Sequence, residues 1–258
     1  MTSTASSGAD RRPPAQRRTG SGTPVRYRRS LRSWPTVALL VGTSVAVLCG
    51  VVVADGEVPA VEESVFHAVN DLPEALRPAM WVFQLAGLLL VPLGVAIAAA
   101  VLRRYRLAVA LVALIPLKLL VEKGVVKQLV ERSRPGTSIC AGDAACGNFR
   151  DVPLSGPSFV SGHAIVAWGI ATLLWPYLPP RWRWVPVCIA ALNAVARVYL
   201  GAHNPLDVVG GAAVGVAVGA LLTIATGLPV TDPPGAAATA QDRAGPTDVP
   251  PPTTGGPR

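Results

Sequence analysis

Three short polar segments of the chain carry side chains that can bind and transfer a phosphoryl group. In chain order these side chains and backbone positions are Lys127, Arg134, Ser161, Gly162, His163, Arg197, His203 and Asp207. Fixed cations can hold phosphate oxygens and stabilise the charge that develops during transfer, and a histidine beside a carboxylate can act as a nucleophile. The combination predicts a phosphate-handling site.

The three cations of the set are Lys127, Arg134 and Arg197. Arginine offers a planar fork for two phosphate oxygens, whereas lysine acts as a point charge. For any one of them alone, an ordinary basic residue at a helix end, with its head group in water, is the simpler interpretation. That interpretation is weaker for Arg134, because Pro135 follows it and places it in a loop.

The second segment is expected to begin a helix. Ser158 or Ser161 could cap that helix, and Gly162 would let its free amides approach an anion closely. A plain capped helix explains the two serines equally well. It does not explain His163 at the edge of an apolar run.

The third segment places His203 four residues before Asp207. Asn204 and Pro205 resemble a helix start, with Asn204 as the cap and Pro205 in the first turn. Asp207 could then reach back to the imidazole and leave its other nitrogen nucleophilic. An aspartate in a first helical turn is also normal dipole compensation.

Long apolar runs must position these residues, because the chain is 51% hydrophobic and only 15% charged. They predict an all-α membrane bundle of six transmembrane helices. The expected spans are Trp34–Ala54, Met80–Leu102, Leu107 to beyond Val121, Gly162–Leu178, Trp184–Leu200 and Pro205–Leu228. Spans three to five are short for a bilayer, so one of them could instead be re-entrant.

Two prolines and a set of glycines add detail to these spans. Pro92 and Pro116 are expected to kink the second and third spans. The series Gly211, Gly215 and Gly219 places small residues on one face of the sixth span, where another helix can approach.

Basic residues set the expected orientation. Eight arginines between Arg11 and Arg32, a cluster at 103–106 and another at 181–183 fall at alternate span ends, which predicts a cytoplasmic location for all three. Both termini are then cytoplasmic in the plasma membrane. The four helix ends that carry the candidate site residues all fall on the extracytoplasmic face.

The flanking segments are low in apolar residues. We expect residues 1–33 to be a disordered basic tail, residues 34–228 to be the six-helix membrane domain, and residues 229–258 to be a second disordered tail. The basic tail, beside a span, suggests contact with anionic lipid. No nucleic-acid partner is expected, because no recognition fold accompanies the charge. The sequence does not indicate an oligomeric state.

Cysteines divide into two kinds. Cys49 and Cys188 lie in apolar runs and suit packing. Cys140 and Cys146 lie in a polar loop, and a disulfide between them is expected if the loop is extracytoplasmic. A metal site is disfavoured there, because the loop contains no histidine or further cysteine at zinc-like spacing.

The three polar segments together resemble the type 2 phosphatidic acid phosphatase superfamily, whose pattern is K-x6-RP, PSGH and SR-x5-H-x3-D. The corresponding stretches here are Lys127-x6-Arg134-Pro135, Val160-Ser161-Gly162-His163 and Ala196-Arg197-x5-His203-x3-Asp207. Val160 replaces the family's proline and Ala196 its serine. The resemblance covers about residues 107–228.

The resemblance implies roles for the matched residues. His203 would attack phosphorus and form a phosphohistidine, Asp207 would orient it, and His163 would protonate the leaving oxygen and then activate water. The groups that would hold the phosphoryl oxygens are Lys127, Arg134, Arg197, Ser161 and the Gly162 amide. It implies no cofactor and no metal, since the cations supply the electrostatics.

The resemblance therefore predicts an integral membrane phosphatase for lipid phosphates or diphosphates, such as a polyprenyl diphosphate, phosphatidic acid or phosphatidylglycerol phosphate. A lipid phosphotransferase would use the same residues. A membrane transporter or scaffold is the non-catalytic alternative, in which Lys118, Glu122 and Lys123 line a pathway. Lys118 and Glu122 are also spaced for a simple ion pair. The histidine–aspartate set favours the enzyme.

Overall fold

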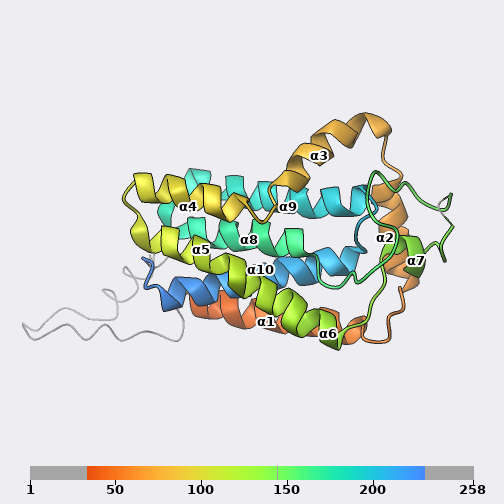
Figure 1. Ribbon diagram of the computed structural model, residues 1–258, viewed down its shortest axis with the longest axis horizontal. Helices are drawn as coiled ribbons and strands as arrows, with labels where there is room; N and C mark the ends of the chain where they lie inside the picture. Colours follow the sequence, from red (N-terminus) through yellow and green to blue (C-terminus); the bar gives the residue numbers. More distant parts are fainter. Residues whose placement is uncertain (1–33, 144, 230–258) are drawn as a thin grey trace, which may run out of the picture. The chain divides into compact units, whose positions relative to one another are not determined.

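A computed structural model describes residues 34–143 and 145–229 of the chain, and in these residues the secondary structure is helical, with no strand (Figure 1). The predicted tails lie, apart from Pro229, outside the described residues. The α-helices are α1 (Trp34–Val52), α2 (Ala60–Asn70), α3 (Arg77–Leu85), α4 (Val91–Val101), α5 (Tyr105–Leu119), α6 (Lys127–Leu129), α7 (Pro135–Ser138), α8 (Gly162–Leu174), α9 (Trp184–Tyr199) and α10 (Pro205–Ala225).

Two of the described helices, α1 and α10, have both the length and the apolar composition to cross a membrane. The α4 helix is apolar but shorter. The all-helical fold class is therefore confirmed for the described residues, whereas the count of six spans stays a prediction.

The expected second span is not one helix. It divides into α3 and α4, with a turn at residues 86–90 between them. Pro92 does not kink a helix interior as predicted, because it lies in the first turn of α4, where a missing amide proton costs nothing. The third span is continuous, since α5 with its internal Pro116 runs directly into a π-helix, Leu120–Val126, and then α6.

The glycine series of α10 permits the close packing that was predicted from it. A Cβ atom at Gly211 or Gly215 would lie 2.6 Å from a backbone oxygen of the α8 segment. On the other side of α10, a Cβ atom at Gly42 of α1 would lie 2.7 Å from the carbonyl oxygen of Ala213. The α10 helix is therefore held between α1 and α8.

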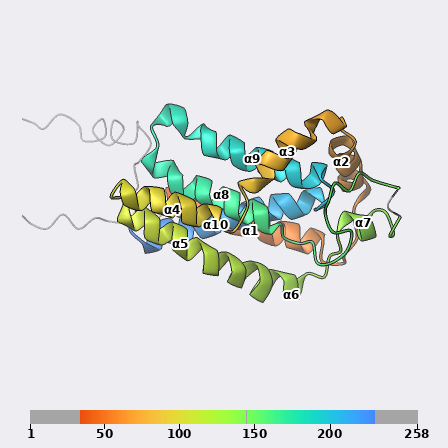
Figure 2. The same cartoon turned by 45° about the horizontal axis from the view of Figure 1, so that its top comes forward.

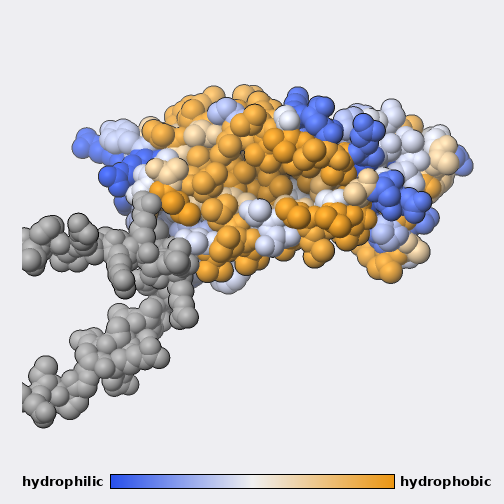
Figure 3. Space-filling model, turned by 90° about the horizontal axis from the view of Figure 1, so that it is seen from below, coloured by the Kyte–Doolittle hydropathy of each residue, from blue (hydrophilic) through white to orange (hydrophobic). Residues whose placement is uncertain are grey.

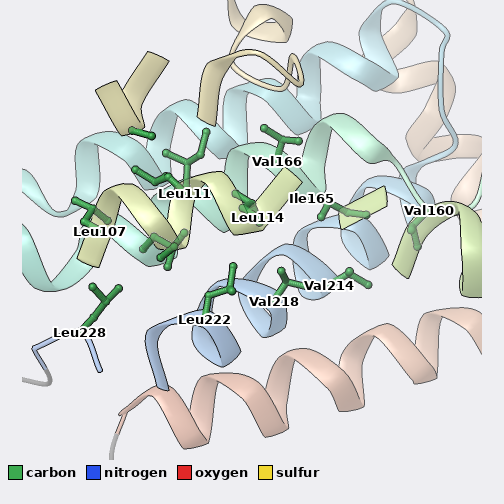
Figure 4. Packing of buried hydrophobic residues seen from close by; sticks show 14 of the residues in the cluster. Leu107, Leu111, Leu114, Val160, Ile165, Val166, Val214, Val218, Leu222 and Leu228 are labelled. Carbon is green, nitrogen blue, oxygen red and sulfur yellow. The ribbon is translucent and has the colours of Figure 1, made fainter. Parts of the chain in front are cut away.

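The hydrophobic core lies where α5, α8 and α10 meet (Figure 4). The labelled side chains there are Leu107, Leu111 and Leu114 from α5, Ile165 and Val166 from α8, Val214, Val218 and Leu222 from α10, with Val160 and Leu228 beside them. This packing fixes the position of the start of α8 relative to the start of α10.

Apolar side chains also dominate the outer surface along the helices. In Figure 3 they form a broad belt, with hydrophilic residues gathered at the two ends. Exposed examples include Leu40 at 63%, Ile97 at 60% and Val101 at 76% of their surface. So large an apolar area is typical of a surface covered by lipid.

The polar segments divide between the two ends of the helices. At one end the basic turn at 103–106 contacts its neighbours: Arg104 lies over the ring of Tyr177, and Arg106 donates to the carbonyl of Gly227 at 3.1 Å. At the opposite end lie α2, α7 and the turn between α9 and α10, and α8 has its start towards that end (Figures 1 and 2). The candidate site and the basic turn are thus separated by the length of the helices.

Candidate active site

His203 lies in the tight turn between α9 and α10. Gly201 has φ +78°, a conformation that side chains resist, and a Cβ atom there would lie 2.8 Å from the ring of Phe149. Asn70 and Arg150 fasten the same turn from outside, because both donate to the carbonyl of Tyr199. The loop around residue 149 therefore holds the turn in the shape that buries His203.

The Nδ1 atom of His203 faces Ser158 and Asp207. It lies 3.4 Å from the hydroxyl of Ser158 and 3.6 Å from Oδ2 of Asp207, and the Ser158 hydroxyl donates to that same Oδ2. The sequence suggested a direct reach from Asp207 to the imidazole. Asp207 does lie beside the imidazole, and the Ser158 hydroxyl contacts both groups. A proton on Nδ1 would face these acceptors and would leave Nε2 as the unprotonated nitrogen.

Asp207 is fully buried and is held on both oxygens. Its Oδ2 accepts from the backbone amide of Asn204 at 2.8 Å, and its Oδ1 accepts from Arg132 at 3.0 Å. Asn204 and Pro205 begin α10 as predicted. The helix start and the histidine are thus fixed by one carboxylate.

Arg132 and Glu62 form a second layer behind Asp207 that the sequence did not reveal. Arg132 donates to both carboxylate oxygens of Glu62, at 3.0 and 2.5 Å, and Glu62 also accepts from the amide of Leu206 at 2.7 Å. Burial opposes the charge on Arg132, but Glu62 and Asp207 outweigh it and raise its pKa. Glu62 lies on α2, so a segment far away in sequence reaches the start of α10.

The start of α8 differs from the prediction in its capping. Ser161 occupies the N-cap position without a side-chain capping bond, and Ser158 faces Asp207 instead. The hydroxyl of Ser161 is buried with no hydrogen-bond partner among the described residues. A buried donor without a partner, beside free helix amides, is the type of group that an anion satisfies.

His163 follows at the second residue of α8. It is close enough to Arg197, His203, Lys118 and Glu122 to interact with them electrostatically. The turn before α4 approaches it from the other side, because a Cβ atom at Gly87 would lie 2.5 Å from the Cβ of His163. His163 therefore has little freedom to move away from His203.

Each of the two arginines of the predicted set uses only part of its guanidinium group in hydrogen bonds within the protein. Arg197 donates to Oε1 of Gln84 at 2.6 Å, and its Nε is buried with no partner among the described residues. Arg134 donates to the carbonyl of Ala202, next to His203, at 3.1 Å. Burial lowers the pKa of Arg134, while Asp207 and Glu122 oppose that shift. Both guanidinium groups therefore lie at the site with donors to spare.

Lys127 is connected to the site by the carboxylate of Glu122. Its ammonium lies 2.7 Å from Oε1 of Glu122, and Lys118 lies 2.5 Å from Oε2 of the same carboxylate. The pairing of Lys118 with Glu122 that their spacing suggested is confirmed. Glu122 also contacts Gly162, so these residues connect the π-helical segment to the start of α8.

The environment of His203 sets its protonation. Burial lowers the pKa of His203 to about 4, although Asp207 opposes the shift, and Arg197 and Arg134 reinforce it. The imidazole is therefore neutral at pH 7, as a nucleophile has to be.

All eight predicted site residues thus lie in one cluster drawn from α6, the loop after it, the start of α8, the end of α9, the turn after α9 and the start of α10. Cys140 and Cys146 lie apart from it and form a disulfide, with Cα atoms 5.4 Å apart, in the loop after α7.

Comparison with known proteins bears on this cluster. A family model, described as the PAP2 superfamily, matches residues 90–228, more than half of the chain. The chain belongs to the PAP2 superfamily. The match includes every residue of the predicted catalytic set and the helices α5, α8 and α10.

One curated relative is the undecaprenyl-diphosphatase of Sulfolobus acidocaldarius, which is 48% identical to this PAP2 chain over 56 residues. That stretch is 21% of this chain and 26% of the relative, so the chain matches about a quarter of the relative's length.

Two solved PAP2 structures share the fold. LpxE of Aquifex aeolicus matches with a TM-score of 0.51 at 24% sequence identity. The match covers 65% of this chain and 98% of the LpxE chain. A transmembrane PAP2-type phosphatidylglycerolphosphate phosphatase from Bacillus subtilis matches with a TM-score of 0.55 at 21% sequence identity. That match covers 74% of this chain and 99% of the phosphatase chain. At these identities the likeness establishes the fold.

Proposed function

We propose that the protein is an integral membrane phosphatase that hydrolyses lipid phosphates or diphosphates through a phosphohistidine on His203. The observation that carries the proposal is the buried imidazole of His203, whose Nδ1 faces Ser158 and Asp207. This arrangement directs Nε2 to one place, and cations with unused donors surround the site. Membership of the PAP2 superfamily supports the same chemistry.

In the first step, the lone pair on Nε2 of His203 forms a bond to phosphorus, and the bond from phosphorus to the leaving oxygen breaks. His163, which carries a proton in the complex with the anionic substrate, gives that proton to the leaving oxygen. Positive charge develops on His203, and Asp207 stabilises it through the Ser158 hydroxyl. Arg134, Arg197 and Lys127 stabilise the phosphoryl oxygens.

In the second step, neutral His163 takes a proton from water while the water oxygen attacks phosphorus. The N–P bond breaks, its electron pair returns to Nε2, and inorganic phosphate leaves. His163 ends protonated, so the enzyme is ready for the next substrate. The cations supply the electrostatic stabilisation in both steps, and we propose that the reaction needs no metal.

The substrate class follows from the apolar belt beside the site. A lipid can keep its chains in the bilayer while its phosphate enters the cluster at the end of the helices. We propose a polyprenyl diphosphate, phosphatidic acid or phosphatidylglycerol phosphate. The undecaprenyl-diphosphatase of Sulfolobus acidocaldarius and the phosphatidylglycerolphosphate phosphatase of Bacillus subtilis support that range.

The site is proposed to face the outside of the plasma membrane, with both termini in the cytoplasm. Support comes from the basic turns, which lie at the opposite end of the helices from His203 and are expected to remain cytoplasmic. A six-span topology is part of this proposal.

The test is phosphate release by the purified protein in detergent with EDTA, against a panel of lipid phosphates and diphosphates. His203→Ala is expected to lose activity at least about a thousandfold, since the covalent step is removed. His67→Ala is the matched control, because His67 lies on α2 outside the cluster. Equal release by His203→Ala would refute the mechanism, and loss in EDTA would refute metal independence. Phosphate found on an added lipid alcohol instead of in solution would identify a phosphotransferase.

A further inference from the structure

Glu122 is a carboxylate placed among the groups that should bind phosphate. It is only 4% exposed and contacts two ammonium groups, those of Lys118 and Lys127, at 2.5 and 2.7 Å. Lys127 is one of the proposed phosphate ligands. Its ammonium is therefore already paired with an anion that belongs to the protein.

The carboxylate also lies against the backbone at the start of α8. A Cβ atom on Gly162 would lie 2.6 Å from Oε2 and 2.8 Å from Oε1 of Glu122. Because Cα–Cβ bonds tilt towards the N-terminal end of a helix, this contact places the carboxylate near the free amides of α8. Those amides are the ones that a phosphate is proposed to approach.

Other donors around this position keep unused capacity. The Ser161 hydroxyl and Nε of Arg197 are buried without partners among the residues that the structure describes. A planar carboxylate has two oxygens and one charge, whereas a phosphoryl group has more oxygens and a larger charge. Glu122 thus satisfies the lysines but leaves these two donors for a larger anion.

We propose that Glu122 is a resident anion that competes with the substrate phosphate for Lys127 and the start of α8. Glu122 compensates the charges of two buried ammonium groups until a phosphate displaces it. It therefore stabilises the fold, and it also weakens phosphate binding. This inference rests on the proposed function and adds a residue that sets the affinity of that site. If Glu122 only positioned Lys127, it would strengthen phosphate binding, and its replacement would weaken that binding.

The test uses inorganic phosphate as the probe with two variants in detergent. Glu122→Gln removes the charge, and Glu122→Asp keeps it but withdraws the carboxylate by one methylene. Both are expected to bind phosphate about tenfold more tightly than wild type, by inhibition of turnover and by phosphate-induced rise in Tm. Both are expected to melt below wild type without phosphate, because the lysines lose their partner. Glu63→Gln, an exposed carboxylate on α2, is the matched control.

Unchanged or weaker phosphate binding in the variants would overturn the proposal, and so would a gain confined to Glu122→Gln, which would be a general charge effect. If Glu122→Gln fails to fold, Glu122→Asp decides. A wild-type protein that hydrolyses lipid phosphates while the variants gain no affinity would sink this inference alone. A wild-type protein that neither hydrolyses lipids nor responds to phosphate would overturn the proposed function and this inference with it.

Discussion

The burial of His203 suits its proposed role as a nucleophile. Histidine has an ordinary pKa of 6.5, and removal from water disfavours the imidazolium, so the pKa of His203 falls to about 4. In the proposed mechanism, the Ser158 and Asp207 contacts matter most when the ring becomes positively charged. The neutral resting imidazole and its charged intermediate would then share one counter-ion, Asp207.

This shift predicts a pH effect on stability. Between about pH 6.5 and 4 the unfolded chain binds a proton at position 203 that the folded protein does not, so stability falls as the pH falls through that window. The loss is expected to reach up to about 3 kcal/mol relative to His203→Gln, which cannot titrate there. Melting temperatures at stepped pH measure it. Parallel curves for the two proteins would show that His203 does not titrate differently in the two states.

Arg132 leads to a second prediction at the residue scale. Its guanidinium is buried between the carboxylates of Glu62 and Asp207. Arg132→Ala leaves two buried negative charges facing each other and is expected to cost about 3–5 kcal/mol of stability. Adding Glu62→Gln should restore part of the loss, because one uncompensated charge is removed. Denaturation in detergent measures the stability of both variants. If Arg132→Ala is as stable as wild type, Arg132 does not compensate the charges of Glu62 and Asp207.

The members of the site could be predicted from sequence because their types and spacings are unusual together. Arg132 and Glu62 could not, since an arginine in a polar loop and a glutamate in an acidic segment also suit a solvated surface. Their pairing depends on α2 folding back onto the start of α10. Gln84, a polar residue in an apolar run, was a readable signal for the contact with Arg197.

At the scale of elements, small residues bring helices into the contacts that the site needs. Gly87, in the turn between α3 and α4, lies against the backbone and Cβ of His163. That turn is also where the predicted second span breaks, a feature that hydropathy alone cannot show, because both halves are apolar. Because of this break, a turn and not the side of a helix lies against His163, the proposed general acid.

Gly87→Ala is therefore expected to displace His163 and to lower kcat about a hundredfold, since small misplacements of catalytic groups carry that cost. Gly94→Ala is the matched control, because an added Cβ at that helical position meets nothing within 4 Å. Turnover of the preferred lipid phosphate measures both. Equal activity of the two variants would show that the turn does not constrain His163.

Two predictions at the scale of helices are confirmed. The glycine series correctly indicated close packing of α10, and the start of α10 at Asn204–Pro205 was correctly located. Ser161, one of the two predicted caps of α8, occupies the N-cap position, but its hydroxyl makes no capping hydrogen bond. Which of them faces Asp207 depends on the path of the chain after the loop.

For the whole molecule, the apolar belt separates two polar ends. We expect an impermeant maleimide added to intact cells to label Ser155→Cys, near the site end, but not Arg181→Cys, at the basic end, until the membrane is permeabilised. Both variants need a Cys188→Ser background, since Cys188 is the exposed free thiol of the described residues. Labelling of Arg181→Cys alone would reverse the proposed orientation.

The contact between α1 and α10 bears on biosynthesis. The α1 helix precedes all other described helices on the ribosome and α10 follows them, yet Gly42 and Ala213 bring the two backbones together. Glu62 and Arg132 likewise emerge well before Asp207. The bundle therefore cannot close, and His203 cannot acquire its partners, until α10 has left the ribosome and entered the membrane. A nascent chain stalled before α10 would be inserted but inert.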